Sequence, residues 1–226
     1  MSELIAFIGV GNMGNPMAEN LMKAGKKVKV FDVSKEMIQK AKDKNLEVVD
    51  NMNQLISDEV TTIITMLPEG KNSKEIYLGE DGVINNVQNN CLLIDCSTID
   101  IQTSIEIGNK AKEKGIKMID APVSGGVMGA KKATLNIMVG GTKEAYEAAL
   151  PLLKIMGKNI FHAGELGSGN GAKICNNMAL GIAMIAASES LMLAKRLNID
   201  VKKVHEIMKN ASGNSWPISV YPPLPG

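Results

Sequence analysis

Short apolar runs alternate with longer amphipathic stretches along the first two thirds of the chain. The runs are rich in Ile, Val and Leu, as the strands of a parallel sheet buried on both faces are. Between them, apolar side chains recur at helical spacing, as Met13, Met17 and Leu21 do. This alternation predicts an α/β protein with a Rossmann-type, doubly wound and mostly parallel sheet.

The same pattern predicts where the elements lie. Strands are expected at Leu4–Gly9, Lys27–Phe31, Val48–Val49, Thr61–Met66, Cys91–Asp95, Lys117–Asp120, Asn136–Val139 and Ile160–His162. Helices are expected at Asn12–Ala24, from Ser34 onward, and at Asp100–Lys114 and Thr142–Met156.

The pattern changes at the glycine-rich stretch Ala163–Gly171, after which the periodicity is helical. Residues Gly171–Arg196 predict one long helix. Its Met178–Ala187 part is apolar on nearly all sides, so we expect other helices or a second subunit to bury it. A further helix is expected at Asp200–Asn210, followed by an irregular, turn-rich segment.

We therefore expect two domains. Residues 1–163 would form the dinucleotide-binding domain. Residues 164–226 would form a partial all-α domain that is begun by the long helix and serves substrate binding or dimerisation. So few residues look incomplete as a domain on their own. The apolar long helix favours a homo-oligomer, a dimer or a tetramer.

Composition excludes several classes of function. The 226 residues carry 25 Lys+Arg against 24 Asp+Glu, and aromatic residues make up 3%. Without a basic surface or stacking platform, neither nucleic acid nor an anionic membrane is an expected partner. The longest apolar run is about half of the ~20 residues that a membrane span needs. No metal site is expected, because no His, Cys or carboxylate cluster has ligand spacing.

The start of the chain shows no signal peptide, so a cytoplasmic location is expected. The mitochondrial matrix stays open in case a transit peptide was removed.

A glycine triplet follows the first predicted strand and opens the first helix. Gly9, Gly11 and Gly14 form the GxGxxG pattern that lets a pyrophosphate approach a helix N-terminus. Asp32 ends the second strand, where a carboxylate binds ribose hydroxyls and repels a 2′-phosphate. This predicts NAD rather than NADP. The alternative is a glycine turn and a surface aspartate in a flavodoxin-like fold that binds no dinucleotide.

Five spaced motifs carry a resemblance to a known family. They read FIGVGNMGNPMAENL, ITMLP, DCSTID, DAPVSGG and GNGAKICNNM, in this order. The chain resembles the β-hydroxyacid dehydrogenases, most closely the 3-hydroxyisobutyrate dehydrogenases. The resemblance implies an NAD-dependent oxidoreductase that interconverts 3-hydroxyisobutyrate and methylmalonate semialdehyde in valine degradation.

The resemblance also implies site residues. The cofactor crevice would include Asn12, Met13, Met66, Leu67, Pro68, Asn72 and Thr98, beside the three glycines and Asp32. Ser124, Gly125 and Gly126 would hold the substrate carboxylate, because a serine and two glycines expose consecutive backbone amides.

Lys173 is the expected general acid or base, and Asn177 lies one helical turn after it. Its site must lower the usual lysine pKa of ~10.4 for it to act at neutral pH. Trp216 and Tyr221 match positions that border the substrate pocket in relatives. His162 and His205 lie outside site-like surroundings, so structural roles are expected for both.

Two alternatives stay open. The same machinery could reduce another short semialdehyde or 2-oxo acid, such as tartronate semialdehyde, glyoxylate or succinic semialdehyde. The chain could also be a non-catalytic dinucleotide-binding module, because family members usually continue with further helices beyond the segment that ends at Gly226.

Overall fold

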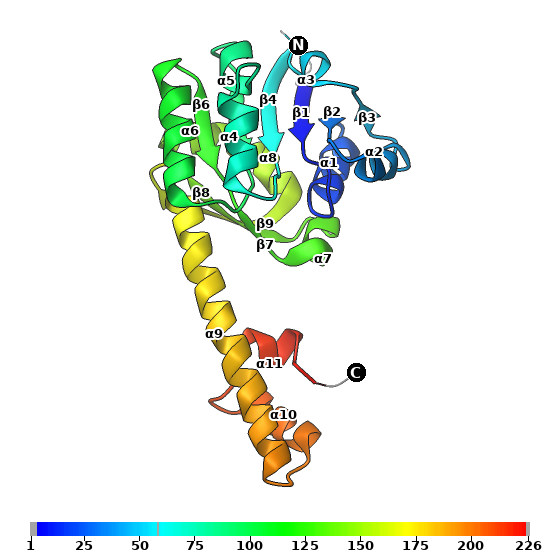
Figure 1. The fold of residues 1–226 in the computed structure, drawn as a ribbon, viewed down its shortest axis with the longest axis vertical. Helices are drawn as coiled ribbons and strands as arrows, with labels where there is room; N and C mark the ends of the chain where they lie inside the picture. Colours follow the sequence, from blue (N-terminus) through cyan, green and yellow to red (C-terminus); the bar gives the residue numbers. More distant parts are fainter. Residues whose placement is uncertain (1–3, 58, 225–226) are drawn as a thin grey trace. The chain divides into compact units, whose positions relative to one another are not determined.

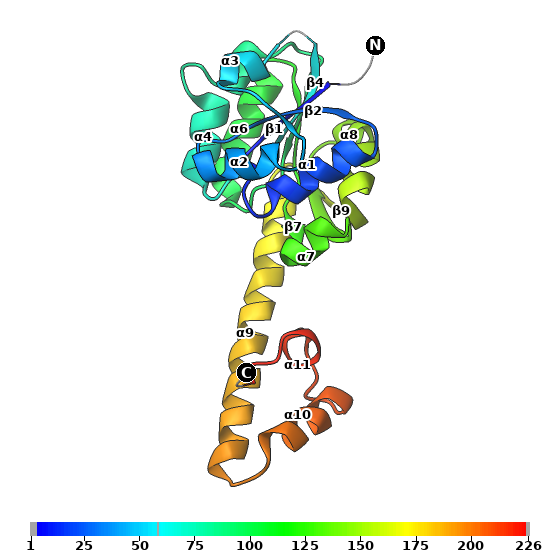
Figure 2. The same cartoon turned by 90° about the vertical axis from the view of Figure 1, so that its right-hand side faces the viewer.

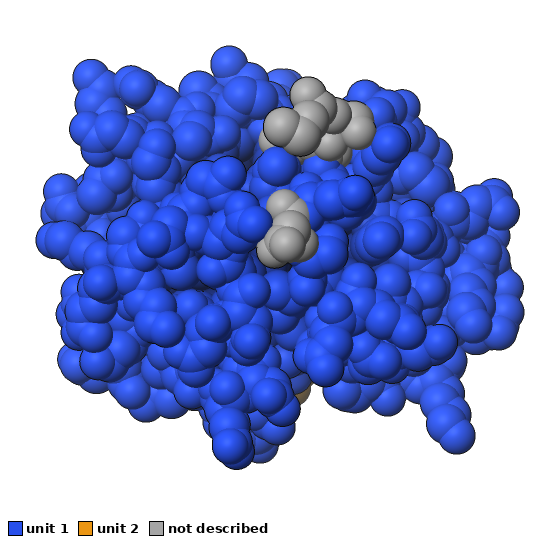
Figure 3. Space-filling model, turned by 90° about the horizontal axis from the view of Figure 1, so that it is seen from above, with its two compact units in different colours: residues 1–173 blue, residues 174–226 orange. Residues whose placement is uncertain are grey.

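The computed structural model describes residues 4–57 and 59–224. The chain divides into two compact units, Met1–Lys173 and Ile174–Gly226, coloured blue and orange in Figure 3. This division lies inside a long helix, after the predicted domain boundary near residue 163. The reason is that the first turns of that helix are bonded to the sheet, as shown below for Asp120 and Asn170.

The first unit contains the whole β-sheet (Figure 1). Its strands are β1 (Leu4–Ile8), β2 (Lys27–Phe31), β3 (Glu47–Val48), β4 (Val60–Thr65), β5 (Leu92–Asp95), β6 (Lys117–Asp120), β7 (Val123–Ser124), β8 (Leu135–Gly140) and β9 (Gly157–Gly164). Its helices are α1 (Gly14–Lys23), α2 (Lys35–Lys42), α3 (Met52–Leu55), α4 (Gly70–Leu78), α5 (Val83–Asn86), α6 (Ile101–Glu113), α7 (Gly126–Lys131), α8 (Lys143–Met156) and the start of α9 (Ser168–Arg196).

The strand order is β3-β2-β1-β4-β5-β6-β8-β7, with β9 paired to β8. Pairs from β3 to β6 are parallel, as is β8 with β9, whereas β8 runs antiparallel to β6 and β7. The first six strands have the Rossmann order, and the direction of winding reverses beside β1. The predicted fold class is confirmed.

Helices cover both faces of the sheet (Figure 2). One buried cluster joins α1 and α8 to the sheet through side chains such as Met17, Phe7 and Leu153. The other joins α3 to α6 to the opposite face, with Leu55, Tyr77 and Ile107 in its core. The central strands β1, β4, β5 and β6 therefore contribute side chains to two separate cores, which is why they read as largely apolar runs.

The second unit contains the rest of α9 and two short helices, α10 (Val201–Asn210) and α11 (Trp216–Val220). α10 contacts α11, and His205 Nε2 forms a 2.8 Å hydrogen bond with the carbonyl oxygen of Ile218. The segment expected to be irregular thus holds one helical turn. Pro217 explains the difference, since proline suits the first turn of a helix.

α9 differs from its prediction in two ways. It begins at Ser168 rather than Gly171, and the side chains of Met178, Ile182 and Ile185 are exposed rather than covered. Nothing in the described part of the second unit packs over them, so the expected burial stays a prediction.

Among the described residues, α9 is the one helix that is long and apolar enough to cross a membrane. The mean hydropathy of its most apolar window is 1.4, and 17% of that window is buried. Length and composition alone support this, and the core helix of a soluble protein passes the same test.

Candidate functional site

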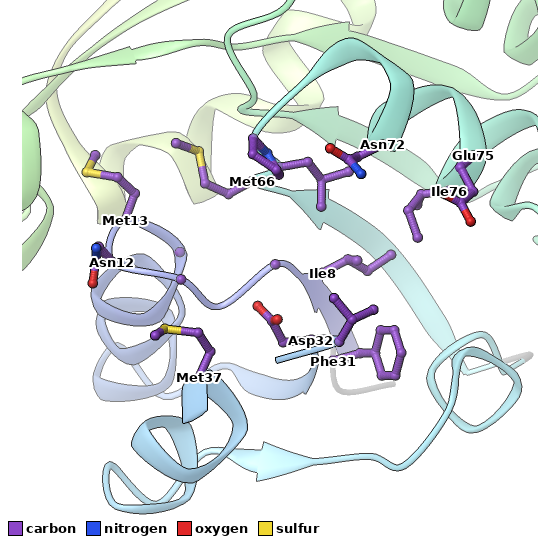
Figure 4. A pocket seen from close by; sticks show the side chains of 16 residues that line it. Ile8, Asn12, Met13, Phe31, Asp32, Met37, Met66, Asn72, Glu75 and Ile76 are labelled. Carbon is purple, nitrogen blue, oxygen red and sulfur yellow. The ribbon is translucent and has the colours of Figure 1, made fainter. Parts of the chain in front are cut away.

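A cavity of about 470 Å³ lies at the carboxyl ends of β1, β2 and β4. Ligands of open α/β sheets bind at this edge, where the strand order reverses. Ten predicted cofactor residues line it: Gly9, Gly11, Asn12, Met13, Gly14, Asp32, Met66, Leu67, Pro68 and Asn72. Figure 4 labels Asn12, Met13, Asp32, Met66 and Asn72 among them, which come from the loop after β1, from the ends of β2 and β4 and from α4.

The glycine loop fits a dinucleotide. Gly9 has φ +89°, and a Cβ there would collide with the carbonyl oxygen of Met66. A Cβ on Gly14 would collide with the carbonyl oxygen of Gly9, so this loop and α1 require glycine. A Cβ on Gly11 would meet no atom within 4 Å, which leaves open space where a pyrophosphate would lie. Met13, the N-cap residue, makes no side-chain capping bond to the start of α1.

Asp32 is fixed at the edge of the cavity. Its Oδ2 accepts a 2.8 Å hydrogen bond from Val10 N–H, and its Oδ1 accepts one of 2.8 Å from Ser34 N–H. An ionised carboxylate offers about four lone-pair sites, so acceptor capacity remains for ribose hydroxyls. The bond to Val10 also holds the glycine loop against β2.

The opposite wall comes from the end of β4 and from α4. Leu67 N–H donates a 2.8 Å hydrogen bond to Ser97 Oγ, which fixes the turn at Leu67–Pro68. Sequence analysis missed further lining residues, namely Ile8, Phe31, Val33, Met37, Glu75 and Ile76. The last two lie on the face of α4 that carries Asn72 (Figure 4), so helical spacing from Asn72 would have found them.

Thr98 does not line this cavity. Its side chain is exposed, three residues beyond the buried Asp95 that ends β5 and next to the buried Ser97. The structure therefore leaves its predicted place in the cofactor crevice untested.

The predicted carboxylate-binding segment follows β7. Ser124 is half-buried, and Gly125 and Gly126 are exposed with φ +133° and +61°. Positive φ at both positions favours glycine, and without a Cβ their backbone amides stay open to a ligand. The segment leads into α7, whose N-cap Gly125 makes no side-chain capping bond.

Lys173 is buried, with 9% of its surface exposed. Burial lowers the pKa of its ammonium group, because a low-dielectric surrounding disfavours the charged form. Among the described residues, no carboxylate lies within ion-pair distance of its Nζ to oppose this shift. A lowered pKa is the direction that the predicted role of Lys173 as a general acid or base requires.

The start of α9 is held by Asp120, which ends β6 and is 1% exposed. Its carboxylate oxygens accept 2.7 Å hydrogen bonds from the amides of Gly167 and Asn170. Burial raises the pKa of Asp120, although these amides oppose the shift. Sequence analysis assigned no role to Asp120 or Asn170. The available signal was their place in two of the five motifs.

The remaining predicted site residues belong to the second unit. Asn177 is exposed, and the rings of Trp216 and Tyr221 stack on each other with centroids 6.5 Å apart. Lys173, Ser124–Gly126 and the cofactor residues all belong to the first unit, and the cavity brings together the ten cofactor residues that line it.

Both histidines have structural partners. His162 Nε2 lies 2.7 Å from the carbonyl oxygen of Gly141, and its ring stacks on Tyr146. His205 joins α10 to α11, as described above. Within residues 4–57 and 59–224, no group of three or more His, Cys, Asp or Glu could hold a metal ion.

The strand order, the glycine loop and the carboxylate at the end of β2 define a Rossmann-type dinucleotide-binding protein. Residues 4–164 match the family described as the NAD binding domain of 6-phosphogluconate dehydrogenase, and residues 167–223 match the NAD-binding domain of NADP-dependent 3-hydroxyisobutyrate dehydrogenase.

Individual relatives agree with these matches. A 3-hydroxyisobutyrate dehydrogenase of Pseudomonas aeruginosa is 45% identical over 222 residues, which cover 98% of this chain and 74% of that protein. A solved Mycobacterium tuberculosis 3-hydroxyisobutyrate dehydrogenase, described together with L-serine, matches with a TM-score of 0.92 and 37% identity over 100% of this chain and 76% of that one. The chain belongs to the β-hydroxyacid dehydrogenase family of NAD-dependent oxidoreductases.

A further relative has a different name. It is an NAD-dependent L-serine dehydrogenase of Pseudomonas aeruginosa, 42% identical over 225 residues that cover 98% of this chain and 74% of that protein. In these comparisons the chain thus spans about three quarters of its relatives.

Proposed function

We propose that this protein catalyses the reversible oxidation of 3-hydroxyisobutyrate to methylmalonate semialdehyde, with NAD preferred over NADP. The observation that carries the proposal is a buried lysine with a lowered pKa in the unit that also holds the dinucleotide cavity. A relative of that name at 45% identity supports the substrate.

When bound, NAD accepts the hydride that leaves the carbinol carbon during oxidation. The chain's own residues bind and orient the acid. Ser124 Oγ and the amides of Gly125 and Gly126 hold the substrate carboxylate. Lys173 Nζ takes the hydroxyl proton during oxidation and returns it during reduction. Asn177, Trp216 and Tyr221, in the second unit, are the further substrate-binding residues that the family resemblance implies.

The direction of the Lys173 pKa supports this role. A lysine at its ordinary pKa is almost fully protonated at pH 7 and cannot accept a proton. Burial increases the neutral fraction, which can act as a base. Asp32 supports the preference for NAD, since its carboxylate would repel the 2′-phosphate of NADP at the edge of the cavity.

L-Serine is the second candidate substrate, supported by the L-serine dehydrogenase at 42% identity. Both acids carry a hydroxymethyl group on the carbon next to the carboxylate. They differ at that carbon, where serine has an ammonium group and 3-hydroxyisobutyrate a methyl group. The same Ser124 and Lys173 contacts therefore serve either acid, and the surroundings of this substituent decide between them.

The deciding experiment measures kcat/KM for both acids with NAD and with NADP, from NADH or NADPH absorbance. We expect 3-hydroxyisobutyrate with NAD to give the highest value. A higher value for L-serine would replace the substrate and leave the mechanism in place. Glyoxylate, tartronate semialdehyde and succinic semialdehyde belong in the reductive assay. A folded protein that binds NAD and turns over none of these compounds would favour a non-catalytic binding module.

We also propose that the protein forms a homo-oligomer and works in a reducing compartment. The exposed apolar side chains of α9 support the first, and the free, buried thiols of Cys91 and Cys96 support the second.

A further inference from the structure

Asn170 is fully buried in the first turn of α9, one turn before Lys173. Its side chain uses both ends of its amide. Oδ1 accepts a 3.0 Å hydrogen bond from Ile99 N–H, and Nδ2 donates a 2.9 Å hydrogen bond to Ser104 Oγ. A buried amide satisfied at both ends has one orientation, so it fixes the distance between the groups that it joins.

Ile99 connects this amide to the wall of the dinucleotide cavity. Ile99 directly follows Thr98, in the segment between β5 and α6. The same segment carries Ser97, whose Oγ accepts from Leu67 N–H on the wall of the dinucleotide cavity. Ser97 N–H in turn donates to the buried carboxylate of Asp95 over 2.9 Å. Asn170 therefore joins the cavity wall to the helix turn that presents Lys173.

Other contacts also hold the start of α9 in place, so a shift of the helix would not restore a lost bond between Asn170 and Ile99. The backbone amide of Asn170 is bonded to Asp120, which fixes the helix along its axis. A Cβ on Gly169 would lie 2.8 Å from the carbonyl oxygen of Asp120, so the helix already contacts the end of β6 through bare backbone. Asp120 thus bonds to the backbone at the start of α9, and the side chain of Asn170 bonds the same turn to Ile99 and Ser104.

We propose that Asn170 is a positioning residue of the dehydrogenase reaction: it sets Lys173 relative to the cofactor cavity through Ile99. The inference rests on the proposed role of Lys173 in proton transfer. An amide fits this position because it pairs an acceptor for Ile99 with a donor for Ser104 without adding a charge, and the acceptor for Ile99 is the part that the positioning role requires.

The test compares Asn170→Leu, which has similar size and makes neither bond, with Ser104→Ala, which leaves the Ile99 bond in place. We expect Asn170→Leu to lower kcat by about 10- to 100-fold, since small misplacements of reacting groups have effects of this size. The Kd for NAD, from titration calorimetry, should change less than about threefold, because Asn170 does not line the cavity. Ser104→Ala should change kcat less than about threefold.

Two further measurements separate positioning from general destabilisation. Amide hydrogen exchange at Ile99 should be faster in Asn170→Leu and unchanged in Ile107→Val, a core variant on α6. Asn170→Asp keeps an acceptor for Ile99 and should recover most of the lost kcat. If the leucine variant does not fold, Asn170→Ala leaves the same bonds unmade without added bulk.

Unchanged kcat in a folded Asn170→Leu protein would overturn the inference, as would an equal loss of NAD affinity and kcat. Lys173→Ala, assayed in parallel, separates the two proposals. If Lys173→Ala is inactive while Asn170→Leu is fully active, only the positioning role is lost. If Lys173→Ala retains full turnover, the proposed proton transfer fails and the positioning role fails with it.

Discussion

The two units of this protein bury their apolar residues to very different extents. The first unit has two cores, one on each face of its sheet, with side chains such as Phe7 and Ile64 fully buried. In the second unit α10 has no buried residue, and twelve of the seventeen exposed large hydrophobic side chains among the described residues lie in residues 174–226. In the first unit, close packing holds the residues of the proposed site in place. The second unit exposes apolar side chains, as surfaces that bind other protein chains do.

The largest expected effect tests whether the chemistry belongs to the first unit. Lys173→Ala should lower kcat about 100- to 10,000-fold, because it removes the group that moves the proton. NAD affinity, measured by titration calorimetry, should stay within about threefold, since Lys173 does not line the cavity. The matched variant in the second unit is Trp216→Ala, which should raise the substrate KM more than it lowers kcat.

The pH profile of the wild type sharpens this result. The rate of oxidation should rise with pH and level off at the Lys173 pKa, which burial places below 10.5. Reduction should show the opposite trend. A profile in Lys173→Ala that keeps the same inflection would assign the proton transfer to another group.

The next effect compares the packing of the units directly. Ile64→Ala in β4 should lower the free energy of unfolding by about 2–5 kcal/mol, because it leaves a cavity in a closed core. Ile182→Ala in α9 removes the same atoms from a side chain that is 61% exposed, so the change should be within about 0.5 kcal/mol. Both come from urea titrations. A large loss for Ile182→Ala would show that its side chain is covered in solution, as it would be in an oligomer.

A smaller effect is expected at the edge of the cavity. Asp32→Ala removes a charged acceptor, and hydrogen bonds to charged groups contribute about 1.5–3 kcal/mol, so the Kd for NAD should rise at least tenfold. The ratio of kcat/KM for NAD to that for NADP should fall. Asp43→Ala, at the end of α2, removes a carboxylate outside the cavity and serves as the control. An unchanged coenzyme preference would show that Asp32 is not the selector.

The smallest expected effect concerns a strained residue in the first unit. Ala133 follows α7 with φ +54°, a left-handed conformation that glycine adopts without a Cβ clash. Ala133→Gly should raise the free energy of unfolding by about 0.5–1 kcal/mol, because relief of strain exceeds the added chain entropy. Thermal unfolding checks this, and a lower Tm would contradict it.

Most of the sheet could be predicted from sequence because its central strands β1, β4, β5 and β6 are apolar runs buried on both faces. The helices α4 and α7 could not. α4 begins at a glycine without a capping side chain and is polar over Lys71–Glu75, and α7 is six residues long and glycine-rich. Contacts of α4 with α6, and of α7 with α1 and β8, stabilise these helices, and no local pattern records such contacts.

The residues of the dinucleotide cavity could be predicted, because its glycines and Asp32 act through local backbone geometry. The residues that hold Lys173 in place could not be predicted. Asp120 and Asn170 are 50 positions apart and meet only after β6, β8 and α9 have come together. For the same reason the start of α9 was placed too late: the residues Ser168–Gly171 have low helix propensity, and Asp120 holds them in a helix.

The Asp120 bonds also set the angular phase of α9. Because the carboxylate holds the amide of Asn170, the direction of each later side chain depends on the number of residues that separate it from that point. One residue inserted between Asn170 and Lys173 would turn the lysine by about 100° around the helix axis and advance it by about 1.5 Å. The three-residue spacing from Asn170 to Lys173 therefore sets the direction of the proposed catalytic amine.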